Sequence, residues 1–196
     1  MRKKSGRLAA TKAIERLLDT EKFVAEVTNA GLSKDALSRA HNVAIIESAI
    51  TLERLVLDCL VVAINNDVSV IRTESQVNFP AHLQDDVVEY IIVGNGYFDF
   101  RGGKSGIVKA VKQYLVDSHW VTQAVKRLDA SQIDRLIALR NWAAHESPQS
   151  ARKAKAAVNQ VRARSAGSWA KVDGRIFEIT AAVRAFALDI QHSAPY

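Results

Sequence analysis

Apolar residues recur every three or four positions along most of this chain, a spacing that is typical of amphipathic helices. The longest such segment begins after Ser33 and reaches about Ile64, where a short polar run interrupts it. Its apolar positions are Val43, Ile46, Ile50, Leu57, Leu60, Val61 and Ile64. The same spacing predicts further helices at residues 8–29, 83–93, 105–116, 120–128, 132–146, 150–165 and 175–191. The pattern therefore predicts an all-α protein with very little strand.

Serine, glycine and proline mark where these predicted helices begin and end. Ser131 is the expected N-cap of the helix at 132–146. Pro148 ends that helix at about Ser147, because a proline disfavours helical backbone in the residue before it. Loops are predicted at residues 66–82, with a short extended piece at 68–71, and between Gly167 and Gly174.

The length and composition are those of one soluble domain. The chain has 196 residues, of which 48% are hydrophobic and 24% are charged. These proportions are ordinary for a globular protein, and the length is sufficient for a substantial core. We expect a single domain over residues 1–196, with an N-terminal helix within 1–31 and a helical core over 33–192.

Several classes of protein are disfavoured by the composition. Cys59 is the only cysteine, and no set of Cys and His residues has the spacing of a zinc site. We therefore expect no internal disulfide, no metal and no cofactor. The most apolar stretch, residues 43–64, carries four charged residues, so we expect it not to span a membrane. The basic N-terminus precedes an amphipathic segment instead of an apolar signal core, which favours a cytoplasmic protein.

Positive charge is concentrated in the second half of the chain. Residues 1–100 hold 11 Lys/Arg and 14 Asp/Glu, whereas residues 101–196 hold 16 and 7. Such a basic half favours an anionic polymer such as RNA as partner, although a small positive excess can simply keep a protein soluble. The densest basic run is either an RNA-binding track or a solvated helix face. It consists of Arg152, Lys153, Lys155, Arg162 and Arg164.

The candidate chemistry lies in residues 140–145, which read Arg-Asn-Trp-Ala-Ala-His near the end of a predicted helix. An arginine can hold a phosphate through two hydrogen bonds, and histidine is the side chain that exchanges protons near neutral pH. Asn141 and His145 are four residues apart and share one helix face, while Arg140 points to the flank of that face. These three residues are the candidate catalytic group for cleaving RNA without a metal.

Two other segments also carry polar groups that bear on this site. Glu53 lies among apolar neighbours on the longest helix. It either orients Arg140 or His145, or it occupies a solvated helix position. Residues 102–105, Gly-Gly-Lys-Ser, resemble the end of a phosphate-binding loop, but Phe98 stands where that motif requires glycine. We therefore interpret this segment as a turn and helix cap.

The pattern Arg140-Asn141-x-x-x-His145 resembles the signature of the HEPN superfamily. The resemblance extends over most of the chain. Residues 47–53 are similar to the first core helix of the RiboL-PSP and MAE-like HEPN groups, and residues 97–103 with 107–109 are similar to their loop and helix between the core helices. The resemblance implies an all-α, HEPN-like helical bundle with short extra helices.

The same resemblance implies a metal-independent endoribonuclease with a composite site at a homodimer interface. In that scheme Arg140 holds the phosphate, His145 moves protons and Asn141 orients the phosphate or the imidazole. A single Arg/His pair is also few groups for phosphoryl chemistry, which independently favours a dimer. A toxin–antitoxin or antiviral setting is implied, with an antitoxin or regulatory partner. The alternative is a non-catalytic RNA- or partner-binding module, itself an antitoxin or regulatory subunit, in which Arg140 and His145 cap or pair within the helix end.

Overall fold

The computed structural model describes residues 5–69, 71, 78–80, 83–99, 102–172 and 174–196. Every regular element within these ranges is an α-helix, which confirms the all-α prediction. The helices are α1 (Gly6–Asn29), α2 (Lys34–Asn66), α4 (Asp85–Val93), α5 (Gly103–Lys112), α6 (Trp120–Arg127), α7 (Ala130–His145), α8 (Pro148–Ala157), α9 (Ala166–Ala170) and α10 (Arg175–Ser193). None of the helices in the described ranges is both long and apolar enough to cross a membrane.

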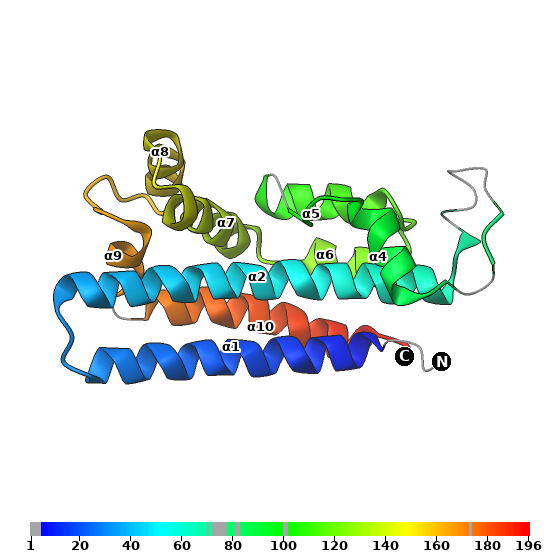
Figure 1. Ribbon diagram of the computed structural model, residues 1–196, viewed down its shortest axis with the longest axis horizontal. Coiled ribbons are helices and arrows are strands. Elements are labelled where there is room, and N and C mark those ends of the chain that lie inside the picture. Colours follow the sequence, from blue (N-terminus) through cyan, green and yellow to red (C-terminus); the bar gives the residue numbers. More distant parts are fainter. Residues whose placement is uncertain (1–4, 70, 72–77, 81–82, 100–101, 173) are drawn as a thin grey trace.

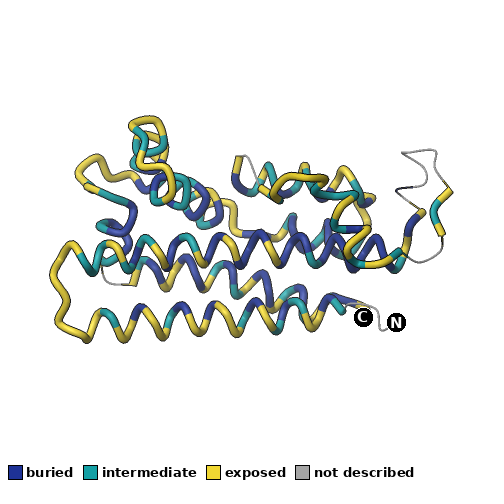
Figure 2. Tube along the Cα trace, viewed as in Figure 1, coloured by how far each residue is buried: buried dark blue, intermediate teal, exposed yellow. Residues whose placement is uncertain are grey.

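Helix α2 is the centre of the molecule. It packs against α1 and α10 on one side and against α7 and α4 on the other (Figure 1). Its second half is apolar around the whole circumference, and every residue from Leu55 to Asn65 except Asp58 is buried (Figure 2). A helix that is apolar on all sides is stable only when other elements cover it completely. Helix α7, which carries the candidate residues Arg140, Asn141 and His145, is one of the elements that cover α2.

Helix α1 belongs to this same core. Its buried positions recur every three or four residues, as the sequence pattern predicts, and they join one apolar cluster with residues of α2, α7 and α10. Polar contacts also join α1 to α10. Glu21 of α1 accepts hydrogen bonds from Arg184 Nη1 at 2.7 Å and from Thr180 Oγ1 at 2.6 Å. The two ends of the chain also meet, since the Gly6 amide donates to the Tyr196 carbonyl at 3.0 Å.

The segment after α7 differs most from the sequence prediction. The helix expected at 150–165 begins at Pro148 and ends at Ala157, and Asn159 then takes a left-handed conformation with φ of +50°. A new short helix, α9, begins after Ser165 where a loop was predicted. Its first turn is closed by a capping box, in which the Ser165 and Ser168 side chains each bind the backbone of the other residue.

Smaller differences occur at the ends of other helices. Asp129, not Ser131, is the N-cap of α7, and its side chain accepts from the Gln132 amide. Helix α7 ends at His145 because Glu146 adopts a left-handed backbone, and Pro148 instead opens α8. In the predicted loop, Ser69 and Ile71 are helical, so the expected extended piece is wrong at these two residues. Val70 and residues 72–77 and 81–82 lie outside the described residues.

Candidate functional site

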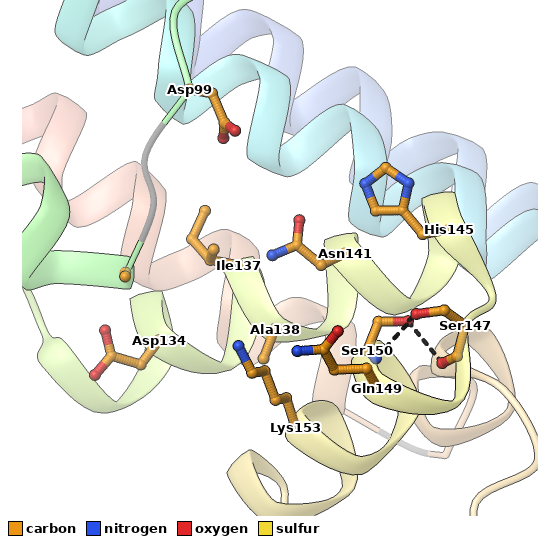
Figure 3. A pocket seen from close by; sticks show the side chains of 12 residues that line it. Asp99, Asp134, Ile137, Ala138, Asn141, His145, Ser147, Gln149, Ser150 and Lys153 are labelled. Carbon is orange, nitrogen blue, oxygen red and sulfur yellow. Dashed lines mark hydrogen bonds between the residues drawn. The ribbon is translucent and has the colours of Figure 1, made fainter.

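One face of α7 lines a cleft that contains two of the three candidate catalytic residues. Asn141 and His145 both line this cleft, as their four-residue spacing predicts (Figure 3). The opposite face of α7 is held in the core by Ile133, Leu136 and Leu139, all fully buried. This amphipathic pattern fixes which way α7 faces, and therefore directs Asn141 and His145 away from the core.

The other wall of the cleft comes from α8. Because Glu146 reverses the chain and Ser147 caps α8 through the Ser150 amide at 3.1 Å, α8 turns back against α7. Lys153 of α8 consequently lines the same cleft as Asn141 and His145 (Figure 3). The cleft has a volume of about 460 Å³ and is open to solvent. A cation, an amide and an imidazole thus converge on one space large enough for a nucleotide phosphate and sugar.

His145 is exposed at the last residue of α7, and within the described residues its ring makes no hydrogen bond. An imidazole without a fixed partner keeps both ring nitrogens available for a ligand or for proton transfer.

Arg140 points to the flank of the cleft and does not line it. Its Nη2 donates to Glu53 Oε1 at 3.1 Å, and its Nη1 donates to Asn141 Oδ1 at 3.0 Å. Asp99 Oδ1 lies 3.8 Å from the same Nη1. The flank position agrees with the helical geometry of α7, but the guanidinium turns toward Glu53 instead of toward His145. Asn141 connects the two halves of the site, because it lines the cleft and also accepts from Arg140.

Glu53 occupies a buried position, which decides between its two interpretations. Its side chain is only 11% exposed, and it forms an ion pair with Arg140, not with His145. Burial raises the pKa of Glu53 above its usual range, the Arg140 charge lowers it, and the Asp99 carboxylate raises it further. A solvated position would show none of these effects. Glu53 therefore orients Arg140 from the neighbouring helix.

The basic run is divided between two elements. Lys153 lines the cleft, and the Lys155 ammonium lies 5.6 Å from the centre of the Trp142 ring, where it makes a cation–π contact. Arg152 is exposed on α8. Arg162 and Arg164 are exposed too, but they lie in the loop after α8 and not on the same helix. The structure therefore brings Lys153 to the cleft, holds Lys155 against Trp142 and leaves the last two arginines on a separate segment.

Two carboxylates at the site are missing from the sequence interpretation. Asp99 lines the cleft and lies beside Arg140. Asp134 of α7 accepts a hydrogen bond from the Lys104 amide at 2.8 Å and so caps the first turn of α5. A side chain on Gly103 would collide with Asp134, which is why a glycine with a positive φ stands there. The segment at 102–105 is thus a turn and helix cap, as predicted, and neither carboxylate is signalled by a local motif.

Comparisons of the chain with protein-family models, with curated proteins and with solved structures find no match. Among the described residues, no three His, Cys, Asp or Glu side chains are arranged to hold a metal ion. What the site does is therefore inferred from its own geometry and chemistry.

If α8 carries the phosphate backbone of RNA, reversing its free charges should change the salt dependence of binding. We expect the double variant Arg152→Glu/Lys153→Glu to bind single-stranded RNA more weakly and to flatten the log–log salt slope by about 1.4, because each phosphate contact contributes about 0.7. Lys155 is left intact, since it packs on Trp142. The measurement is affinity for one labelled RNA over a salt series.

The matched control is Lys12→Glu/Lys22→Glu, which makes the same charge change on α1, on the other side of α2. It should leave the slope within about 0.3 of wild type, since distant surface charges are screened. Equal slopes for both double variants would mean that the α8 run is only a solvated face.

Proposed function

We propose that this protein is a metal-independent endoribonuclease with an HEPN-like helical bundle, and that Asn141 and His145 act on RNA bound in the cleft. The observation that carries the proposal is the convergence of an unpartnered imidazole, an amide and Lys153 on one open cleft, with Arg140 directly beside it. These are the groups needed to bind a phosphodiester and to move a proton at it.

In the proposed reaction the 2′-hydroxyl oxygen of RNA attacks the adjacent phosphorus atom. The imidazole of one His145 accepts the hydroxyl proton as the new P–O2′ bond forms. The bond from phosphorus to the 5′-oxygen breaks, and that oxygen leaves with a proton from an imidazolium. The products are a 2′,3′-cyclic phosphate and a 5′-hydroxyl, and no water or metal enters this step.

Arg140 stabilises the negative charge that develops on the phosphate oxygens. To do so, its guanidinium releases the Glu53 and Asp99 carboxylates and binds the phosphate in their place. A phosphate, like a carboxylate, accepts two parallel hydrogen bonds from one arginine side chain. Asn141 is placed to guide this exchange, because its Oδ1 already holds Nη1 at the edge of the cleft. Lys153 supplies a second positive charge from the opposite wall.

The proposed active form is a homodimer in which two copies of the cleft face each other. One protomer supplies a single imidazole, while the reaction uses one proton acceptor and one proton donor. A two-fold axis beside α7 supplies the second. In support, His145 is exposed at the end of α7, where the imidazole of a second copy can approach it.

The rival proposal is a non-catalytic RNA- or partner-binding module of the same fold. The observation that favours it is the engagement of Arg140 with Glu53 and Asn141, which gives the arginine a structural role without any substrate. The cellular setting, a cytoplasmic toxin–antitoxin or antiviral system with an antitoxin or regulatory partner, rests on the family resemblance alone.

The proposal is tested by RNA cleavage in the presence of a chelator. Wild-type protein should cleave single-stranded RNA in excess EDTA at a rate within about twofold of the rate with magnesium, because proton transfer by an imidazole needs no metal. The products should carry 2′,3′-cyclic phosphate ends. Loss of cleavage in EDTA with full recovery on adding magnesium would replace this scheme with metal-assisted hydrolysis.

A further inference from the structure

A second hollow of about 520 Å³ adjoins the cleft. It is lined by Tyr97, Asp99, Gly106, Lys109, Ala110 and Gln113. Asp99 lines both spaces, so the hollow continues the cleft along one side of α5. The two spaces therefore meet at Asp99.

The Tyr97 ring is the chemical feature that distinguishes this hollow. Tyr97 is 97% exposed, the highest exposure of any large apolar side chain among the described residues. An aromatic ring that no protein group covers offers both of its faces to a ligand. Flat unpaired bases bind such rings by stacking, and this is how proteins hold single-stranded RNA.

Lys109 gives the hollow a positive charge that is not already used. The other lysines of α5 are engaged, because Lys104 Nζ donates to the Leu128 carbonyl at 2.6 Å and Lys112 forms an ion pair with Asp117 at 2.7 Å. Lys109 is exposed, and no carboxylate in the described part of the chain lies within 4.0 Å of it. It therefore remains free to bind an anion beside the tyrosine.

We propose that this hollow is a nucleobase subsite for single-stranded RNA. In it, Tyr97 stacks on an unpaired base next to the phosphate held in the cleft, and Lys109 binds a neighbouring phosphate. The Gln113 amide lies in the same hollow and both donates and accepts, so it can bind the edge of the base. This inference rests on the proposed function, because it takes RNA as the ligand of the cleft. Stacking is tolerant of sequence, so the subsite senses the presence of a base more than its identity.

The test measures binding, so that it does not depend on cleavage. A short single-stranded RNA containing 2-aminopurine is titrated with His145→Ala protein and with the same protein carrying Tyr97→Ala, Tyr97→Phe or Tyr90→Ala. Tyr90 is the matched control, since it is 60% exposed on α4 and lines neither the cleft nor the hollow. We expect Tyr97→Ala to weaken affinity by about 10-fold or more and to abolish the quenching of the probe. Tyr97→Phe and Tyr90→Ala should each stay within about threefold of the parent protein.

A second RNA, which lacks one base at a single position, makes the test specific for stacking. Removing the stacked base should weaken the affinity of the parent protein by about the same factor as Tyr97→Ala does. The affinity of the Tyr97→Ala protein should not fall further when that base is removed. Additive losses, or unchanged affinity in Tyr97→Ala, would overturn the subsite even if wild type cleaves RNA. Binding that depends on Tyr97 in a protein that never cleaves RNA would uphold the subsite and refute the endoribonuclease.

Discussion

Replacing His145 with alanine should lower the rate of RNA cleavage by about 10²-fold or more, because general acid–base catalysis by a positioned imidazole contributes at least that factor. The fold should be unaffected, since His145 is exposed and makes no hydrogen bond within the described residues. The measurement is single-turnover cleavage of a labelled RNA, accompanied by thermal unfolding. Arg140→Ala should cause a similar loss by removing a charge contact in the transition state.

The matched control is His192→Ala, which removes another exposed histidine near the end of α10. It should cleave RNA at the wild-type rate. Mixing His145→Ala protein with wild type adds a test of the composite site. If each site needs two protomers, the mixture should lose more activity than dilution explains. Cleavage at the wild-type rate by His145→Ala would show that residues 140–145 are not the catalytic group and would favour the non-catalytic module.

Gly167→Ala should cause the largest loss of stability, about 3 kcal/mol of unfolding free energy, because overpacking a tight contact forces the backbone to move. A Cβ at Gly167 would overlap the Ser38 carbonyl oxygen and lie 2.8 Å from the Asn42 amide nitrogen. The Gly167 amide also donates to Asn42 Oδ1 at 2.5 Å, so α9 cannot shift away from α2 without losing this bond. Thermal unfolding followed by circular dichroism should show a midpoint lower by roughly 6–12 °C.

Gly96→Ala is the control for this variant, since within the described residues the nearest atom to its Cβ would be the Val93 carbonyl oxygen at 3.5 Å. It should change the unfolding free energy by no more than about 0.5 kcal/mol. Equal midpoints for Gly167→Ala and Gly96→Ala would mean that α9 does not pack against α2 as described.

Helices whose apolar positions repeat over several turns could be predicted from the sequence. The segments predicted at 8–29 and 175–191 correspond to α1 and α10 within about two residues at each end, because their periodicity reports directly which face packs on α2. The segment at 150–165 was predicted as one helix because its alanines and basic residues favour helix locally. The break at Asn159 and the restart at α9 depend instead on the capping box and on the fit of Gly167 against α2.

The candidate site likewise combines residues that helical spacing predicts with residues that only tertiary packing brings together. The shared face of Asn141 and His145 follows from helical spacing alone, and the structure places both residues in one cleft. The contact between Arg140 and Glu53 joins residues 87 positions apart in the chain. No local pattern reports such a contact, and Asp99 reaches Arg140 from a third segment for the same reason. The sequence therefore indicated the groups on α7 and offered Glu53 only as one of two alternatives, whereas Asp99 was not predicted.

The ion pair between Glu53 and Arg140 has a thermodynamic consequence for ligand binding. A phosphate that takes Arg140 leaves Glu53 buried, beside Asp99 and without the positive charge that lowers its pKa. Burial already raises that pKa, so loss of the arginine's charge raises it further. Binding of an anion at Arg140 is thus coupled to proton uptake, and by linkage its affinity increases as the pH falls toward the pKa of Glu53. A lower pH would therefore strengthen ligand binding through a residue that the ligand itself does not touch.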